Sequence, residues 1–255
     1  MKGNEYMILG MHKSGTTAVA EILMKSAFNL GFDLKPEEGD YKAEKGESRM
    51  VREINNIILG SHGKYSLNIN EVDEINSDEL EKVNLKIADF IKFQNAYGEW
   101  AIKDPRLILT FKFWRYHLPN CRCILVFRSP IDVVMRYIKS LSLLKKLLLF
   151  PFRTKKALKV WLIYNTKLIE IFNHIGPSNS LIINYESLMD TDYEIQRLEN
   201  FIGRKLSEGR TSKHKQPDNF IDKAIRLYVL SFSNSYVKLY RELMELRSAS
   251  IILTK

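Results

Sequence analysis

The 255-residue sequence predicts an α/β fold in which helices flank a central parallel sheet. Short apolar runs at residues 6–9, 100–102, 121–127 and 180–184 alternate with longer segments whose apolar residues recur at helical spacing. Strands that alternate with helices in this way usually pair in parallel, with helices on both faces of the sheet. Because parallel strands end at one edge of a sheet, we expect the chemistry at their carboxyl ends.

Composition bounds the class of protein. An apolar fraction of 45% and a charged fraction of 27% are typical of a soluble globular chain, and the length suits one domain over residues 1–255. Thirty-nine Lys and Arg against thirty Asp and Glu give a net charge of +9. This charge favours an anionic nucleotide, and an anionic acceptor or membrane surface, as partners. No zinc-ligand pairs and no aromatic RNA-binding signature occur, so nucleic acid is not an expected partner.

Cysteine usage and the start of the sequence bear on location. Cys121 and Cys123 are the only cysteines, which fits a reducing compartment and leaves too few ligands for a zinc site. The first apolar run begins at residue 6, so we expect no signal peptide or transmembrane anchor. These features predict a cytoplasmic protein without a zinc site, and they indicate no oligomeric state.

The first strand leads into a loop bracketed by two glycines, residues 10–17 (GMHKSGTT). Gly10 and Gly15 allow backbone conformations in which successive N–H groups turn toward an anion. Thr16 begins a helix whose free N–H groups and dipole also favour negative charge. The loop is therefore predicted to bind phosphate. The alternative is an ordinary glycine-containing turn between a strand and a helix.

The spacing of the two glycines matches the Walker A loop, but Thr16 stands where a nucleotide triphosphatase carries lysine. The cation comes earlier in this loop, at Lys13. With the lysine inside the loop, its charge can lie against a phosphate and its transferable neighbour without a magnesium-bound triphosphate. This arrangement favours a nucleotide whose reactive group is not a γ-phosphate.

Helical segments separate the first two strands. The first helix is expected over residues 16–30, and an acidic loop over 33–49 follows it as a place for catalytic groups. Helical spacing continues at 54–58 and at 83–91, the second segment being introduced by a capping sequence at 76–79.

The second and third strands end in charged turns. Residues 103–106 (KDPR) follow the strand at 100–102, and Arg128 follows the strand at 121–127. Ser129 and Pro130 then begin a helix, as its cap and its first residue. Together with the loop that carries Lys13, three cationic strand ends are predicted to gather around a polyanionic ligand.

The C-terminal half is predicted to be helical around one strand. Helices are expected over residues 155–175, 192–202 and 220–246, with the strand at 180–184 between the first two. The segment 141–158 mixes leucine and phenylalanine with lysine and arginine, and it is too short and too charged to span a membrane. It could lie on an anionic bilayer, line an acceptor cleft, or form a lid or core helix with a solvated basic face.

Together these motifs resemble the sulfotransferases that use 3′-phosphoadenosine-5′-phosphosulfate (PAPS), most closely the bacterial branch and more remotely the tyrosylprotein sulfotransferases. The resemblance implies an α/β P-loop fold and covers roughly residues 5–205. It rests on the loop at 10–17, Trp100 with residues 103–106, Arg128-x-Pro130-x-Asp132-Val133, and two later segments, 184–188 (NYESL) and 197–203 (RLENFIG).

The resemblance implies a donor site formed by the loop and Arg128. Arg128 would bind the 3′-phosphate. The family usually pairs this arginine with a serine eight residues later, where this chain has Arg136, and an arginine can also form a charge-assisted bond to phosphate. The implied contacts to the 5′-phosphosulfate come from the Lys13 ammonium, from His12 and from the backbone N–H groups of Ser14, Gly15, Thr16 and Thr17.

Sulfuryl transfer needs an acceptor oxygen in line with the leaving phosphate, a base, and cations for the developing charge. Lys13 and Lys103 suit the cationic role without a metal, and Lys103 matches the lysine to which the tyrosylprotein enzymes give a catalytic part. Alignment with the glutamate that follows the family's first helix indicates Glu47 as the base. Glu44 is the alternative, and the histidines are further titratable candidates.

The predicted function is transfer of a sulfuryl group from PAPS to a hydroxyl or amine, with a carbohydrate acceptor by family resemblance. Acceptor-side insertions at about 33–75 and 138–156 carry no diagnostic pattern. One alternative is a kinase-like P-loop transferase, against which the absence of lysine after Gly15 argues. The other is a noncatalytic nucleotide-binding or membrane-associated P-loop protein. This alternative stays open because Arg136 stands where the family usually has serine.

Overall fold

Four parallel strands form one sheet, as the sequence predicts, in the order β2-β1-β3-β4. The strands are β1 (Glu5–Leu9), β2 (Trp100–Lys103), β3 (Arg122–Phe127) and β4 (Ser180–Asn184). The register pairs Ile8 with Lys103 and Leu9 with Leu125, so the strands end at a common edge. This computed structural model describes residues 5–30, 46–60, 75–139, 141–210, 220–231 and 234–252.

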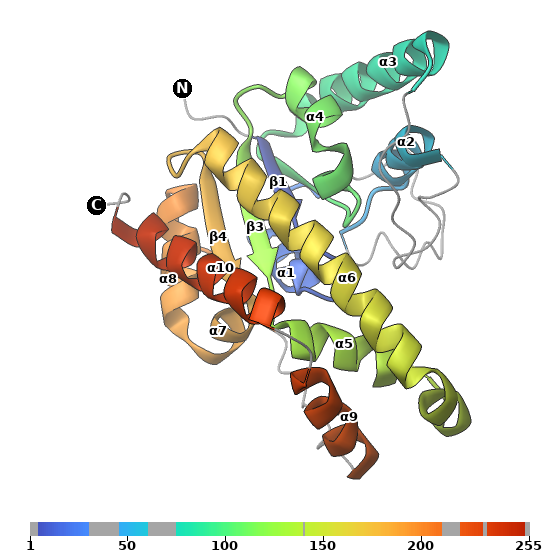
Figure 1. The fold of residues 1–255 in the computed structure, drawn as a ribbon. Helices are drawn as coiled ribbons and strands as arrows, with labels where there is room; N and C mark the ends of the chain where they lie inside the picture. The colour runs from blue at the N-terminus through green and yellow to red at the C-terminus, as the bar shows by residue number, and fades with distance from the viewer. Residues whose placement is uncertain are drawn as a thin grey trace.

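Helices cover both faces of the sheet, with α6 and α10 in front and α1 behind (Figure 1). Alternate residues of β1 enter two apolar clusters: Met7 and Leu9 lie in one, and Tyr6 and Ile8 in the other. The first cluster is closed by α2 (Arg49–Leu59), α3 (Ser77–Gln94), α4 (Leu107–His117), α5 (Pro130–Lys139), α6 (Leu143–Ile175), α9 (Phe220–Leu230) and α10 (Asn234–Ile252). The second is closed by α1 (Thr16–Lys25), α7 (Tyr185–Asp190) and α8 (Asp192–Ile202).

Capping residues set several helix starts where the sequence predicts them. Asn76 precedes α3 and its side chain accepts a hydrogen bond of 2.9 Å from the Glu79 N–H. Helix α5 begins at Pro130, and the Ser129 hydroxyl lies 3.5 Å from the Asp132 N–H. The strand β4 and the helix α8 also have the predicted bounds. A short 3-10 helix, Asn95–Tyr97, joins α3 to β2.

Three predicted helices differ from the structure, and α4 and α7 were not predicted. Helix α1 ends at Lys25 rather than near residue 30, because the Ser26 hydroxyl bonds back to the Ile22 carbonyl (2.8 Å) and Ala27 takes a positive φ of 63°. Helix α6 begins at Leu143, twelve residues before the predicted start, and it contains Pro151. The segment predicted as one helix over 220–246 forms α9 and α10.

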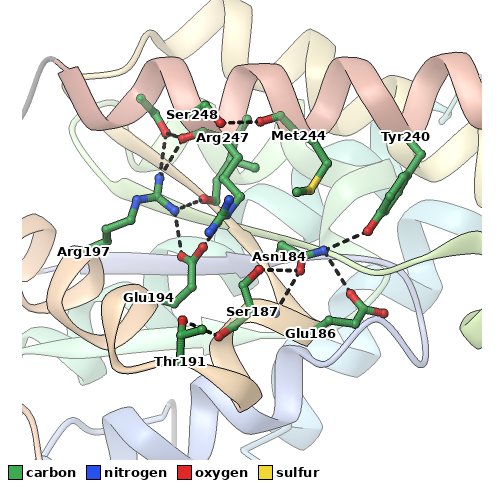
Figure 2. A network of polar contacts seen from close by, with 12 residues as sticks. Asn184, Glu186, Ser187, Thr191, Glu194, Arg197, Tyr240, Met244, Arg247 and Ser248 are labelled. Atoms are coloured by element: carbon green, nitrogen blue, oxygen red, sulfur yellow. Dashed lines mark hydrogen bonds and ion pairs between the residues drawn. The ribbon is translucent and has the colours of Figure 1, made fainter.

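The C-terminal helix α10 is joined to α8 and β4 by a buried ionic network (Figure 2). The fully buried Glu194 carboxylate accepts hydrogen bonds from Arg197 Nη1 (2.7 Å) and from Arg247 Nε. Arg197 also donates to the carbonyl of Ile182 in β4 (3.1 Å) and to Ser250 Oγ in α10 (2.8 Å). Every buried charge in this network has a partner, which buried ions require.

Two further observations concern expectations from the sequence. Cys121 and Cys123 are both free and buried. Among the helices of the described ranges, none is long and apolar enough to cross a bilayer.

Candidate functional site

The loop between β1 and α1 depends on glycine at both ends. Gly15 precedes α1 with φ of 103°, a conformation that strains residues with a Cβ. A Cβ on Gly10 would lie 2.5 Å from the Val126 carbonyl oxygen, so the loop leaves the sheet in close contact with β3. Lys13 itself has φ of 68°, which is uncommon for a lysine and typical of functional loops.

Groups that favour an anion gather in this loop. The Lys13 side chain is exposed and forms no ion pair within the described part of the chain. The Ser14 hydroxyl is buried, and no described residue forms a hydrogen bond with it. Thr16 and Thr17 begin α1, whose first turn contains no acidic residue. An exposed cation, an unpartnered hydroxyl and a helix N-terminus together form a site that suits a phosphate.

His12 is uncharged at neutral pH. Burial lowers its pKa to about 4, and the nearby cations Arg106, Lys103 and Lys13 act in the same direction, although Asp104 opposes them. His12 can therefore form hydrogen bonds beside the loop but adds no positive charge to it.

The end of β2 brings Lys103 to the loop. Lys103 Nζ lies 3.2 Å from Thr17 Oγ1 and 2.6 Å from Glu47 Oε1. The Lys103 side chain is 2% exposed and that of Glu47 is 15% exposed. Glu47 comes from the residues just before α2, whose cap is Ser48. The residues predicted separately as a catalytic cation and a base thus form an ion pair beside the loop.

The rest of this strand end has a structural role. Asp104 is fully buried and accepts two hydrogen bonds from the Arg106 guanidinium, at 2.8 and 2.9 Å. Arg106 Nη1 also donates to Asn56 Oδ1 in α2, at 2.6 Å. For Arg106, whose guanidinium is paired with the buried Asp104, a place beside the ligand stays a prediction.

The end of β3 places Arg128 beside the same loop. Its guanidinium lies over the Tyr185 ring, with 4.4 Å between Cζ and the ring centroid. Arg128 Nε is buried and 3.5 Å from Glu186 Oε1, and it forms no hydrogen bond with a described residue. Tyr185 also packs against the loop, since a Cβ on Gly15 would lie only 2.0 Å from Tyr185 Cδ2. Tyr185 therefore connects Arg128 to the loop.

Glu186 faces Arg128 from the start of α7. Its carboxylate accepts hydrogen bonds from the Ser129 N–H (3.2 Å) and from Asn184 Nδ2 (2.9 Å). Asn184 Nδ2 also lies 3.5 Å from the Tyr240 hydroxyl, so α10 reaches this strand end (Figure 2). Burial raises the pKa of Glu186, and the positive charge of Arg128 opposes that shift.

Tyr185 and Glu186 are site residues to which the sequence reasoning gave no role. The signal for them was present, because residues 184–188 directly follow β4 and strand ends share one edge. Their contacts to Gly15 and Arg128 depend on chain segments far apart in the sequence, which the spacing of motifs does not reveal.

The other candidates have no contact with this cluster among those that the structure describes. Arg136 is exposed on α5 and forms no hydrogen bond or ion pair with the residues described. His117 lies on α4, where its Nε2 is 3.0 Å from Asn84 Oδ1 of α3. Glu44, His62 and much of the predicted insertion at 33–75 lie outside the described residues. In the described ranges, no group of three His, Cys, Asp or Glu could hold a metal ion.

The chain is similar to known proteins in sequence and in fold. The model of a family described as the sulfotransferase family matches residues 6–208. No curated protein matches the chain. Among solved structures, the chain is similar to the sulfotransferase domain of the olefin synthase of Synechococcus PCC 7002, with 16% identity, 94% coverage of each chain and a TM-score of 0.51. It is also similar to a sulfotransferase from Mycobacterium avium, with 12% identity, coverage of 92% of this chain and 70% of that chain, and a TM-score of 0.49. The first of these likenesses shows a shared fold.

Proposed function

Because the chain belongs to the sulfotransferase family, we propose that it transfers a sulfuryl group from PAPS to a hydroxyl or amine acceptor. The observation that supports this proposal most strongly is the meeting of three strand ends at one loop. Lys103 contacts Thr17 at 3.2 Å, and Arg128 stacks on Tyr185, which packs against Gly15. Cations from β2 and β3 thus adjoin the loop that carries Lys13.

The residues at this edge fit a nucleotide with two separate phosphate groups. Lys13, the unpartnered Ser14 hydroxyl and the N-terminus of α1 suit the 5′-phosphosulfate. Arg128, whose Nε forms no hydrogen bond with a described residue, suits the 3′-phosphate. ATP lacks a 3′-phosphate and would offer no such group to Arg128. Arg136, which is exposed on the helix that follows Arg128, would make a second contact to that phosphate.

PAPS supplies the sulfuryl group. The residues of the chain accept the proton of the acceptor and stabilise the negative charge on the leaving phosphate. Glu47 accepts the proton that the acceptor hydroxyl releases. Its ion pair with Lys103 holds the carboxylate beside the phosphate loop. Lys103 and Lys13 stabilise the negative charge that develops on the phosphate side of the broken bond, which is the role that preorganised cations perform best. The proposal requires no metal.

The acceptor and the location are part of the proposal by resemblance and composition alone. A carbohydrate acceptor follows from the family resemblance, and a cytoplasmic location follows from two free cysteines. The acceptor would approach Glu47, because the proton leaves the acceptor oxygen there.

The proposal is tested by transfer of radioactive sulfur from labelled PAPS to a panel of hydroxyl and amine acceptors that includes oligosaccharides. We expect transfer by the wild type, a loss of at least about a hundredfold in Lys13→Ala, and no change in Lys86→Ala, an exposed lysine of α3. Binding of PAPS with no transfer to any acceptor would instead support a noncatalytic nucleotide-binding protein. Magnesium-dependent hydrolysis of ATP would support a kinase-like transferase.

A further inference from the structure

The first half of α6 and the helix α9 carry large exposed apolar side chains that the proposed reaction does not use. On α6, Leu148 is 70% exposed and Phe152 is 67% exposed, and on α9 Leu227 is 68% exposed. Single exposed leucines are ordinary, but large apolar groups on two neighbouring helices indicate an interaction surface. We call this the α6/α9 surface, formed by the exposed side chains of Leu148, Leu149, Phe152, Phe220, Leu227 and Leu230.

The two helices touch through their inner faces. The rings of Phe150 in α6 and Tyr228 in α9 are 5.2 Å apart, in an edge-to-face arrangement. Leu148 and Phe152 each lie two residues from Phe150, which places them about 200° around the helix axis from it. They therefore point away from the contact with α9. Both segments lie at the same end of the molecule, beyond the edge of the sheet and beside α5 (Figure 1).

Positive charge accompanies these apolar groups. Lys145, Leu148, Phe152, Lys155 and Lys159 are all exposed, and their spacing of three or four residues forms one stripe along α6. The chain has no acidic residue from 143 to 169, and the first is Glu170. The basic residues in that range are Lys145, Lys146, Arg153, Lys155, Lys156, Lys159 and Lys167.

The acidic group of α9 does not offset this charge at the surface. Asp222 is the one acid in that helix, and it is buried and lies 3.7 Å from Lys139 Nζ at the end of α5. Lys223, the next residue, is exposed. Within the described ranges, Lys145, Lys155, Lys159 and Lys223 form no ion pair, so they add positive charge beside the exposed leucine and phenylalanine side chains.

We propose that the α6/α9 surface docks on an anionic phospholipid bilayer through its α6 side. The exposed leucine and phenylalanine side chains of α6 enter the headgroup region, and the lysines of the stripe contact lipid phosphates. A second copy of the chain fits less well, because a symmetric interface would bring the same lysines face to face. Helix α5, about 15 Å long, starts two residues after Arg128 and ends at the contact with α9, so it connects the proposed donor site to this end of the molecule.

The experiment is flotation of the full chain, without nucleotide, on phosphatidylcholine vesicles with and without phosphatidylglycerol. We expect binding only to vesicles that contain phosphatidylglycerol, and weaker binding at high salt. The double variant Leu148→Ser/Phe152→Ser should lower vesicle partitioning by about tenfold or more. Lys155→Gln should lower it by about fivefold at low salt. The matched control is Leu85→Ser on α3, where Leu85 is 61% exposed, and its partitioning should equal that of the wild type.

Three outcomes would overturn the proposal. The first is the absence of vesicle binding, and the second is equal binding to neutral and anionic vesicles. The third is a wild-type dimer in light scattering that Leu148→Ser/Phe152→Ser dissociates, since the surface would then join two copies. Thermal unfolding serves as the folding check, and because both side chains are mostly exposed we expect the variants to melt like the wild type. Vesicle binding is measured without donor or acceptor, so its result is independent of the proposed transfer reaction.

Discussion

The ion pair between Lys103 and Glu47 gives a prediction that separates catalysis from stability. Lys103→Met keeps the length of the side chain but removes the ammonium that lies 2.6 Å from Glu47 and 3.2 Å from Thr17. We expect kcat for sulfuryl transfer to fall by about 10²–10³-fold, the loss typical of one preorganised group at a developing negative charge. We also expect the free energy of unfolding to fall by about 2–3 kcal/mol, somewhat less than for a fully buried pair, because Glu47 retains 15% exposure to solvent.

The double variant Lys103→Met/Glu47→Gln tests this reasoning. It leaves neither charge unpaired, so the free energy of unfolding should recover toward the wild-type value. Activity should not recover, because the cation and the base perform different tasks in the proposed reaction. Single-turnover transfer from labelled PAPS and urea unfolding measure the two quantities, with Lys86→Met on α3 as the control. If activity recovers together with stability, the pair has only a structural role and the reasoning is refuted.

Three further predictions concern the loop and the C-terminal helix. The His12 pKa of about 4 lies below its ordinary 6.5, so between these pH values the unfolded chain binds more protons than the folded chain. The free energy of unfolding therefore decreases as the pH is lowered. Urea unfolding should give a value up to about 3 kcal/mol lower at pH 4 than at pH 7, and His12→Gln should lack this contribution. If the wild type and this variant lose stability equally, His12 is not the cause. Gly15→Ala should lower the free energy of unfolding by about 2–4 kcal/mol, because the positive φ strains a residue with a Cβ and the Tyr185 ring occupies the position of that atom. The melting temperature should fall accordingly, and an unchanged melting temperature would contradict this prediction. Arg197→Met should lower the free energy of unfolding by about 3–5 kcal/mol by leaving Glu194 without one of its partners, and a loss below about 1 kcal/mol in urea unfolding would show that the network does not anchor α10.

Features of the fold that depend on local pattern could be predicted from the sequence. The apolar runs predicted the parallel sheet because they alternate with helical segments, even though the helix α4 between β2 and β3 was not predicted. The start of α5 followed from Ser129 and Pro130, whose chemistry is suited to a helix start. The end of α1 could not be predicted in this way, because Ser26 ends the helix by a hydrogen bond to Ile22 in a segment that otherwise has helical spacing.

The break between α9 and α10 has a similar cause. The Ser231 hydroxyl bonds back to the Tyr228 carbonyl at 2.7 Å, and helix α9 ends just before it although the apolar spacing continues. Serine competes with helical hydrogen bonds only where its side chain takes that rotamer, which the sequence does not specify. The helix α6 shows the opposite case, since Pro151 lies inside it without ending it.

Residues of the candidate site could be proposed from the sequence, but the contacts between them could not. Lys103 and Glu47 were each expected from motifs, yet their ion pair joins residues that are distant in the sequence. Arg106 was expected among the cations near the ligand, and its ion pair with the buried Asp104 beside it was not foreseen, although a buried carboxylate requires such a partner. Tyr185 had no assigned role because its contacts to Gly15 and Arg128 exist only in the folded chain.

The most direct test of the proposed donor site is calorimetric titration with 3′-phosphoadenosine 5′-phosphate. We expect the wild type and Lys86→Ala to bind it equally, and Lys13→Ala and Arg128→Ala to bind it at least about tenfold more weakly, since each loses a charged contact to phosphate. Adenosine 5′-phosphate, which lacks the 3′-phosphate, should bind the wild type and Arg128→Ala with the same affinity. Two results would contradict the proposal. The first is that the wild type binds magnesium ATP as tightly as 3′-phosphoadenosine 5′-phosphate. The second is that Lys13→Ala and Arg128→Ala both bind 3′-phosphoadenosine 5′-phosphate as tightly as the wild type does.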